Sequence, residues 1–267
     1  MVRVGQRLGK YRLKRRVARG GFGDVFEAYD TIEGISVALK VPLGTVTEAH
    51  IEDFRREVRI TAKLDHPNIL PIKNADFIEG VFVIVQPLGE QSLDDRMSRR
   101  MTFVQKMNCI EQLLAGLAHA HERGVIHCDI KPDNMILFAD GRLRLADFGI
   151  AKFARKTVQG SASGSVGYMA PEQALGRPSA KSDVFSAGLV LHELLTGKLP
   201  KWPFEWPFEE GRQRMRTHHP DLRELVRRSL EVSTRKRYAD AAVMYRAFGR
   251  VKRKALRHAE ERRARKR

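Results

Sequence analysis

Two short segments in the middle of the chain gather the side chains best suited to chemistry. The first reads His127-Cys128-Asp129-Ile130-Lys131-Pro132-Asp133-Asn134, and the second reads Asp147-Phe148-Gly149. Together they supply a carboxylate that can orient a hydroxyl, a lysine that can stabilise developing charge, and oxygen ligands for magnesium. Phosphoryl transfer requires these groups. A structural loop would carry one of them by chance, but four in this order favour a catalytic site.

Two upstream features would complete such a site, although neither is specific alone. Val37-Ala38-Leu39-Lys40 reads as a strand that ends in a lysine, and Glu57 in the following helix could hold that lysine in place. A lysine on a strand is more often a solvated edge. Gly20-Gly21-Phe22-Gly23 separates two predicted strands, where glycine lets backbone N–H groups approach a phosphate. A plain hairpin is the commoner meaning of such a turn.

The elements that must position these residues change type along the chain. The first third predicts a five-stranded sheet that carries one helix, because short β-branched and aromatic runs alternate with turns. A helical period appears once there, over Glu48–Leu64. The expected strands are Tyr11–Val17, Val25–Tyr29, Ile35–Val41, Ile72–Ile78 and Val81–Gln86.

Beyond residue 92 the chain reads as mostly helical, apart from a hairpin over Met135–Leu145. The order predicts an α+β chain of two lobes, a small β-rich N-lobe over about residues 1–86 and a larger helical C-lobe over about 87–250. The hinge is expected at residues 86–89. The expected helices of the C-lobe are Phe103–Arg123, Val184–Thr196, Asp221–Leu230 and Ala239–Val251.

Length and composition limit the class of protein. The chain has 267 residues, which suits one domain of two lobes. No apolar run is long enough to span a bilayer, and the N-terminus lacks the apolar region of a secretory signal. Two cysteines form no disulfide framework, so a cytoplasmic location is expected. The net charge of +17 predicts affinity for polyanions.

These motifs, in this order and spacing, resemble the protein kinase family, specifically the eukaryotic-like serine/threonine kinases of bacteria. The resemblance covers about residues 11–248 and implies the bilobal protein kinase fold. It also accounts for later residues: 164–173 resembles the end of an activation segment, and Asp183 would support the catalytic loop from below. Arg237 lies where the family places the partner of the Ala-Pro-Glu glutamate, here Glu172.

The resemblance implies ATP and Mg²⁺ as cofactors and a role for each site residue. Asp129 would orient or deprotonate the substrate hydroxyl, Lys131 would stabilise the transferring phosphoryl group, and Glu57 would hold Lys40 on the α- and β-phosphates. Asn134 and Asp147 would bind the metal. His127, Phe148 and Asp183 would be structural, Ser165 would lie near the acceptor residue, and Val85 would be the gatekeeper. The remaining nucleotide contacts would come from Val17, Gly20, Gly21, Phe22, Gly23, Val25, Ala38, Gln86, Leu88 and Ile136.

Two departures from the family pattern leave an alternative open. Ala18 replaces the first loop glycine, and Cys128 replaces an arginine that normally pairs with a phosphate on the activation segment. Weak dependence on phosphorylation at Thr157, Ser161 and Ser163 is therefore expected. A pseudokinase that acts as a scaffold or binding module is the alternative. A small-molecule kinase of the aminoglycoside type is disfavoured, because such enzymes typically lack Lys131 and the Ala-Pro-Glu-like segment.

The composition changes once more near the end of the chain. Residues 251–267 read as a basic tail, with only Glu260 and Glu261 among many lysines and arginines. The tail could tether the kinase to a polyanion or an acidic partner, or it could simply extend the last helix. Because no aromatic residue interrupts it, sequence-specific nucleic-acid recognition is not expected. The expected substrates are proteins with serine or threonine acceptors.

Overall fold

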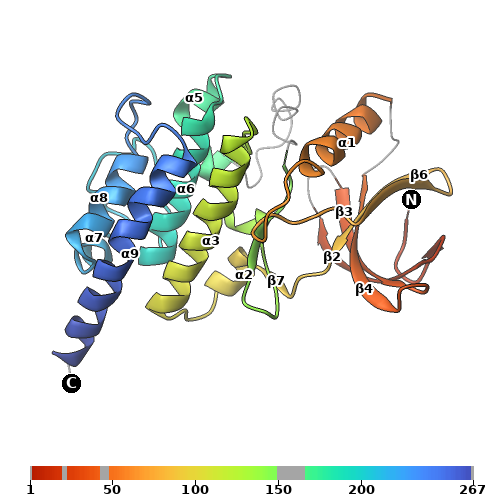
Figure 1. The fold of residues 1–267 in the computed structure, drawn as a ribbon, viewed down its shortest axis with the longest axis horizontal. Helices are drawn as coiled ribbons and strands as arrows, with labels where there is room; N and C mark the ends of the chain where they lie inside the picture. Colours follow the sequence, from red (N-terminus) through yellow and green to blue (C-terminus); the bar gives the residue numbers. More distant parts are fainter. Residues whose placement is uncertain (1, 20–22, 43–47, 149–165, 266–267) are drawn as a thin grey trace.

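The protein, in a computed structural model, is described over residues 2–19, 23–42, 48–148 and 166–265. Figure 1 shows two lobes, with a curved sheet at one end and a helical bundle at the other. The N-terminus lies in the sheet lobe, whereas the C-terminus lies at the far end of the helical lobe. The expected α+β bilobal architecture is confirmed.

The N-lobe is a six-stranded antiparallel sheet with the order β1-β2-β3-β4-β6-β5. The prediction of five strands missed β1, which Gly9 makes possible: its φ of +55° turns the chain so that Leu8 pairs with Tyr11. The helix α1 spans Glu48–Thr61. The strands are β1 Arg7–Leu8, β2 Tyr11–Arg19, β3 Gly23–Asp30, β4 Ile35–Pro42, β5 Asn74–Ile78 and β6 Val81–Pro87.

Side chains alternate between the two faces of β4, so that one face packs into the N-lobe core and the other carries predicted site residues. Val37, Leu39 and Val41 are buried in the N-lobe core. Their neighbours Ala38 and Lys40 therefore point to the opposite face, because successive side chains of a strand alternate. Strand pairing thus aims one lysine and one small residue at the space between the lobes.

The C-lobe packs its long helices around α6, and nearly all of the 17 residues of α6 are buried. Both α9 and α6 pack against α3 (Figure 1). A small sheet, β7-β8-β9, lies beside the lobe boundary. The elements are β7 Gln91–Ser92, α2 Leu93–Met97, α3 Phe103–Glu122, β8 Met135–Leu137, β9 Leu143–Leu145, α5 Pro171–Ala174, α6 Ala180–Thr196, α7 Arg212–Arg216, α8 Pro220–Ser229 and α9 Ala241–Ala264.

The expected end of the last helix at Val251 is wrong, because α9 continues to Ala264. Val251, Ala255 and Leu256 extend its apolar face at helical spacing and pack against the core. Lys252 Nζ adds an ion pair to Glu111 of α3 at 2.7 Å. The predicted domain boundary at residue 250 therefore falls inside a continuous helix. No helix of the described residues is long and apolar enough to cross a membrane.

Candidate active site

The segment that carries Asp129 is held from below by Asp183 of α6. The Asp183 carboxylate is fully buried and accepts the backbone N–H groups of His127 and Cys128, each at 2.7 Å. His121, at the end of α3, lies 2.9 Å from the same carboxylate through its Nε2. A buried carboxylate is tolerated only when it is paired in this way. The arrangement ties the loop to α6 and α3.

His127 braces the next part of the site. Its ring is fully buried, with Nε2 2.9 Å from the carbonyl oxygen of Ala146. The Nδ1 atom accepts the backbone N–H of Asp129 at 3.2 Å. Phe148 packs on the imidazole at a centroid distance of 4.5 Å. His127 thereby links the segment around Asp129 to the one around Asp147.

The catalytic-loop side chains form one cluster. Asn134 Nδ2 donates to the carbonyl oxygen and to Oδ2 of Asp129, both at 2.9 Å. Lys131 Nζ lies 3.1 Å from the same Oδ2. Asp129 keeps partial exposure, since 23% of its side chain is accessible. A carboxylate held by an amide and an ammonium group, yet open to solvent, can meet a hydroxyl group that approaches from outside.

Asp147 and Lys40 bring the two lobes together. Lys40 Nζ donates to Asp147 Oδ1 at 2.7 Å, and the lysine side chain is only 6% exposed. Burial by itself would raise the pKa of Asp147, but the attraction of Lys40 outweighs it and holds that pKa below its ordinary value. Asp147 therefore stays ionised at neutral pH, as its predicted role of metal ligand requires.

Two backbone angles show how tightly this region is held. Cys128 and Asp147 both adopt φ of +63°, a left-handed conformation that L-residues avoid at a cost of about 1–2 kcal/mol. The hydrogen bonds that the Cys128 amide donates to Asp183 and that Lys40 donates to Asp147 oppose this cost. Such strain, held in place by surrounding contacts, is typical of functional sites.

The sheet places several predicted nucleotide contacts on the face that carries Lys40. Val25 pairs with Lys40 across β3 and β4, so their side chains share a face. Ala38 lies two residues from Lys40 on that face and pairs with Gln86 of β6. The small side chain of Ala38 leaves space between the lobes. Val85, the predicted gatekeeper, is 1% exposed and packs into the N-lobe core.

At the hinge, the chain lies close to β8, the strand that carries the predicted nucleotide contact of the C-lobe. A Cβ on Gly89 would meet Ile136 Cγ2 at 2.2 Å, so only glycine lets the hinge approach β8 there. Ile136 and Leu88 are both half-buried beside this contact. Val17 lies on β2 and is 44% exposed. These positions surround the lobe boundary and leave apolar side chains accessible.

Part of the predicted site lies outside the described residues. Gly20, Gly21 and Phe22 fall there, as do Ser165, Thr157, Ser161 and Ser163. Gly23 is described and begins β3. Glu57 lies within α1, but its side chain is not described, so its pairing with Lys40 stays a prediction.

Two contacts hold the Ala-Pro-Glu segment, and one of them reaches the catalytic loop. Arg237, 3% exposed, donates to both carboxylate oxygens of Glu172, at 2.7 and 3.0 Å, which confirms the predicted pair. Gln173 Nε2 donates to the carbonyl oxygen of Cys128 at 2.6 Å. Sequence reasoning missed Gln173 and His121 as positioning residues. The only signal for His121 was its place at the end of the helix that precedes the loop.

The fold and the site define a protein kinase domain. The protein kinase domain model matches residues 11–248. Over 207 residues the chain is 35% identical to the serine/threonine-protein kinase PrkC of Bacillus subtilis, covering 74% of this chain and 32% of PrkC. Over 215 residues it is 37% identical to the serine/threonine-protein kinase PknA of Mycobacterium tuberculosis, covering 74% of this chain and 49% of PknA.

Solved structures agree on the fold. The PknI kinase domain of Mycobacterium tuberculosis has a TM-score of 0.71 at 22% identity, covering 94% of this chain and 99% of that structure. A structure titled PpkA-294 apo form reaches 0.79 at 20% identity, covering 93% and 99%. The chain belongs to the protein kinase family and is of the bacterial serine/threonine type. It spans about a third to a half of the length of these curated relatives.

Proposed function

We propose that this protein transfers the γ-phosphate of ATP to serine or threonine hydroxyls of other proteins. The observation that carries the proposal is the cluster in which Asp129 is held by Lys131 and Asn134, with the Lys40–Asp147 pair completing the site. Each group has the chemistry that its role demands. The family relationship suggests the reaction, and the geometry of the cluster supports the role proposed for each residue.

In the proposed reaction, the substrate Oγ attacks the γ-phosphorus, and the bond from that phosphorus to the β,γ-bridging oxygen breaks. The hydroxyl proton passes to the carboxylate of Asp129, and ADP is the leaving group. Lys131, which contacts Asp129 at 3.1 Å, is placed to stabilise the charge on the transferring group. Lys40 would orient the α- and β-phosphates. Positioning and charge stabilisation supply nearly all of this catalysis.

The residues present suit magnesium. Asp147 offers an ionised carboxylate, and its pKa is held low by Lys40. The amide nitrogen of Asn134 is engaged with Asp129, so its amide oxygen is the atom that remains for a metal. A carboxylate with an amide oxygen is the hard donor set that Mg²⁺ prefers. When bound, the ion would neutralise phosphate charge.

Adenine would lie between the two lobes. Val17, Val25 and Ala38 from the sheet and Ile136 from β8 would sandwich the ring. Backbone groups from Gln86 to Leu88 would bind its edge. Glycines 20, 21 and 23, with Phe22, would cover the phosphates.

The pseudokinase alternative rests on Ala18 and Cys128. Ala18 lies in β2 and pairs with Val25, next to a register shift between Arg16 and Ala18. Its φ is not positive, so its methyl group is accommodated. Cys128 contributes to the loop through its backbone: its N–H donates to Asp183, and its carbonyl oxygen accepts from Gln173. Neither substitution removes a group that the proposed reaction needs.

The test is transfer of radiolabelled γ-phosphate from ATP to a generic protein substrate, with phosphoamino-acid analysis. Asp129→Asn and Lys40→Met are each expected to lower transfer by at least about a hundredfold. Asp133→Asn, a matched change on an exposed side chain of the same loop, should preserve most activity. Full activity of Asp147→Ala would refute the assignment.

Two further parts of the proposal concern the location of the protein in the cell and its affinity for polyanions. Both cysteines are free and buried, which suits a reducing cytoplasm.

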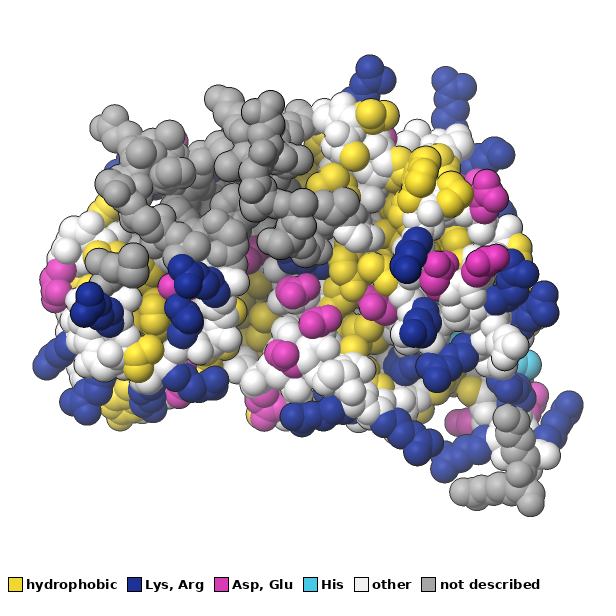
Figure 2. Space-filling model, turned by 180° about the vertical axis from the view of Figure 1, so that it is seen from behind, with side chains coloured by type: hydrophobic (Ala, Val, Ile, Leu, Met, Phe, Trp, Pro, Cys, Tyr) yellow, Lys and Arg dark blue, Asp and Glu magenta, His cyan; other side chains and the backbone are white. Residues whose placement is uncertain are grey.

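Lysines and arginines crowd the C-lobe end of the molecule near the C-terminus (Figure 2). Three exposed arginines in the last part of α9, Arg253, Arg257 and Arg263, would bind polyanions weakly through charge alone. Heparin affinity that is insensitive to salt would contradict this.

A further inference from the structure

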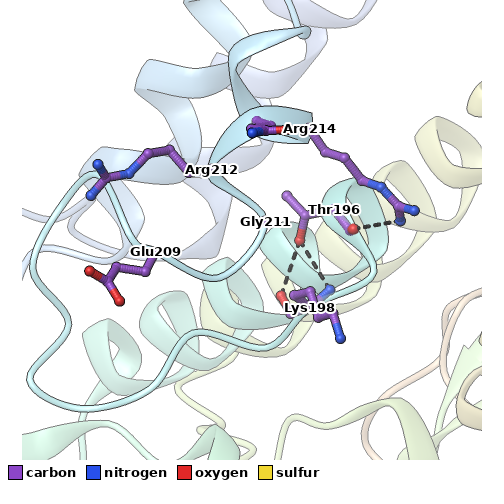
Figure 3. Close-up of a pocket in the computed structure, with 7 residues that line it drawn as sticks. Thr196, Lys198, Glu209, Gly211, Arg212 and Arg214 are labelled. Atoms are coloured by element: carbon purple, nitrogen blue, oxygen red, sulfur yellow. Dashed lines mark hydrogen bonds between the residues drawn. The ribbon is translucent and has the colours of Figure 1, made fainter.

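A hollow lies on the C-lobe between the end of α6 and α7, well away from the catalytic loop. Its volume is about 530 Å³, and Lys198, Arg212 and Arg214 are among the lining residues (Figure 3). Asp183 and Thr196 are 13 positions apart on α6, so the hollow lies about 20 Å from the loop support at a rise of ~1.5 Å per residue. It is therefore separate from the proposed nucleotide site.

The backbone of this hollow is closely built. Gly211 adopts φ of +72°, and a Cβ there would lie 2.4 Å from Thr196 Cβ. Only glycine allows the loop to turn so close to the last turn of α6. Arg214 Nη1 donates to the carbonyl oxygen of Thr196 at 2.8 Å, drawn as a dashed line in Figure 3. Arg212 Nη2 donates to the carbonyl oxygen of Pro207 at 3.0 Å.

A second, smaller hollow of about 180 Å³ adjoins the first, because Arg212 lines both. This one is aromatic as well as cationic, with Trp206 and Phe208 beside Arg216 and Arg223. The two aromatic rings are packed edge to face, with their centroids 5.3 Å apart. Together the hollows form a basic and apolar surface around α7, which we call the α7 groove.

The α7 groove has far more positive than negative charge. Five cations line it, and Glu209 is the one carboxylate among its lining residues. None of the ion pairs recorded among the described residues involves any of the five, and Arg223 Nε is buried without a partner. Some basic residues on the adjoining helices do pair with carboxylates: Arg227 pairs with Glu224, and Lys254 pairs with Asp221.

A sixth cation strengthens the field from behind. Lys106 of α3 has a lowered pKa, caused first by burial and then by the nearby charge of Arg214. No hydrogen bond or ion pair of its ammonium group is recorded within the described part of the chain. Cations that outnumber the carboxylates around them lower their electrostatic energy when an anion binds.

We infer that the α7 groove is a docking site for an acidic protein segment, one that presents carboxylates to Lys198, Arg212 and Arg216 and an apolar side chain to Trp206, which packs on the buried ring of Phe208. Arg212 and Arg214 are already held by backbone carbonyls, so little side-chain entropy is lost on binding. Arginine forks match carboxylates in a bidentate fashion. The inference does not depend on phosphate transfer, since an acidic segment can bind to the groove in the absence of ATP.

The mixed lining favours a peptide over a nucleic acid. A phosphate backbone requires a continuous track of cations, whereas Glu209 lies beside Arg212 within this groove (Figure 3). An acidic peptide with apolar residues can avoid that carboxylate by placing an uncharged side chain there. Charge and apolar area then complement the two hollows at once.

The test uses a fluorescein-labelled random copolymer of glutamate and tyrosine, with its affinity for the full chain measured by fluorescence anisotropy without ATP. Arg212→Ala/Arg216→Ala is expected to weaken binding at least about tenfold, which is ~1.4 kcal/mol. The matched control, Arg12→Ala/Lys63→Ala, removes two exposed charges from the N-lobe and should leave affinity within about twofold, a small part of that difference. Trp206→Ala should weaken binding to the copolymer but not to poly-glutamate.

Several outcomes would overturn the inference. Equal losses in the control and groove variants would mean that general charge, not the groove, binds the copolymer. Oligo-dT that competes through the groove as well as the copolymer would indicate a nucleic-acid site. Self-association in sedimentation velocity that Arg212→Ala/Arg216→Ala abolishes would make a second copy of the chain the occupant. Since binding is measured without catalysis, failure of the proposed kinase reaction would not affect the result.

Discussion

Asp183 Oδ1 accepts the backbone N–H of Cys128 at 2.7 Å, at a residue whose φ is +63°. A side chain from the core of the C-lobe thus fixes a strained backbone position next to Asp129. Loss of this contact would release the strain and move the carboxylate. The geometry of the proposed catalytic loop therefore depends on a residue that touches no substrate.

Replacement of Asp183 is expected to impair positioning. In Asp183→Ala the amides of His127 and Cys128 lose their acceptor, which costs about 1–3 kcal/mol for each buried group. Displacement of Asp129 by about 1 Å would lower kcat/KM roughly a hundredfold. Kinetics on a peptide substrate, together with thermal melting, measure both effects.

Ser186→Ala is the matched control for that experiment. Ser186 is buried on the same helix, but its hydroxyl donates only to the carbonyl of Ser182. We expect nearly unchanged catalysis. If Asp183→Ala kept wild-type kcat/KM while folded, the positioning role would be wrong.

The Glu172–Arg237 pair predicts a specific response to acid. Burial tends to raise the pKa of Glu172, but its hydrogen bonds with Arg237 and Ser182 hold that pKa below the ordinary 4.5. A carboxyl group whose pKa is lower in the folded state stabilises the fold at pH values above its pKa in the unfolded chain. That contribution is lost as the pH falls below 4.5 through the folded value.

Arg237→Met therefore should cost at most about 3–5 kcal/mol at neutral pH, because the partly buried carboxylate keeps only its hydrogen bond from Ser182. The difference from the wild type should shrink as the pH falls below 4.5. Urea unfolding at several pH values measures it. A difference that stayed constant down to pH ~3 would argue against linkage through Glu172.

The length of α9 predicts that residues after Arg250 stabilise the domain. Ala255 is 1% exposed, Val251 and Leu256 pack on the core, and Lys252 pairs with Glu111. Truncation after Arg250 should lower the unfolding free energy by a few kcal/mol, at about 1–3 kcal/mol for each buried apolar side chain. Differential scanning calorimetry measures the loss.

A point variant separates packing from charge. Arg253→Ala changes an exposed side chain of the same segment and should leave the melting temperature within about 1–2 °C. Ala255→Asp should approach the effect of truncation. If the truncated chain melted like the wild type, the packing of this segment would not contribute to stability.

His218 predicts destabilisation in mild acid. Burial, together with Lys106 and Arg262, lowers the pKa of His218 to about 4, and its ring stacks on Phe103 at 5.4 Å. The unfolded chain binds this proton near pH 6.5 and the folded chain only near 4, so stability falls as the pH drops between those values.

The size of that effect is about 3 kcal/mol at one pKa unit per ~1.4 kcal/mol. His218→Gln should flatten the stability profile between pH 6.5 and 4. His258→Gln is the nearby comparison: it removes only the smallest of the causes that lower the pKa of His218, so it should retain most of the slope. Chemical unfolding across this range tests both, and an unaltered slope in His218→Gln would exclude His218 as its origin.

The sequence by itself determined the order of the lobes and the contents of the site. Alternation in Ile35–Val41 put Lys40 on the opposite face from the core, and the spacing of Asp129, Lys131 and Asn134 brought them onto one loop. Local periodicity and short-range spacing carry this information. The Glu172–Arg237 pair was reached through family resemblance, because 65 residues separate its members.

Contacts between distant segments were decided by the tertiary structure. One short repeat could not be interpreted from the sequence alone: Trp202-Pro203-Phe204-Glu205 is followed directly by Trp206-Pro207-Phe208-Glu209. In the fold, Phe204 packs on Phe185 and Phe208 on His192, two turns apart on α6. A four-residue repeat in a loop thus matches a seven-residue spacing on a helix, and no local pattern encodes such a match.

The end of α9 and the α7 groove have the same origin. Whether Val251–Ala264 was a solvated tail or a packed helix depended on whether α3 and α8 offered it a surface, and they do. Arg212 and Arg223 were unremarkable in a basic chain until folding placed them in a groove where five cations outnumber the single carboxylate of Glu209. Charge and apolar area are read from sequence, but their partners are set by packing across the whole chain.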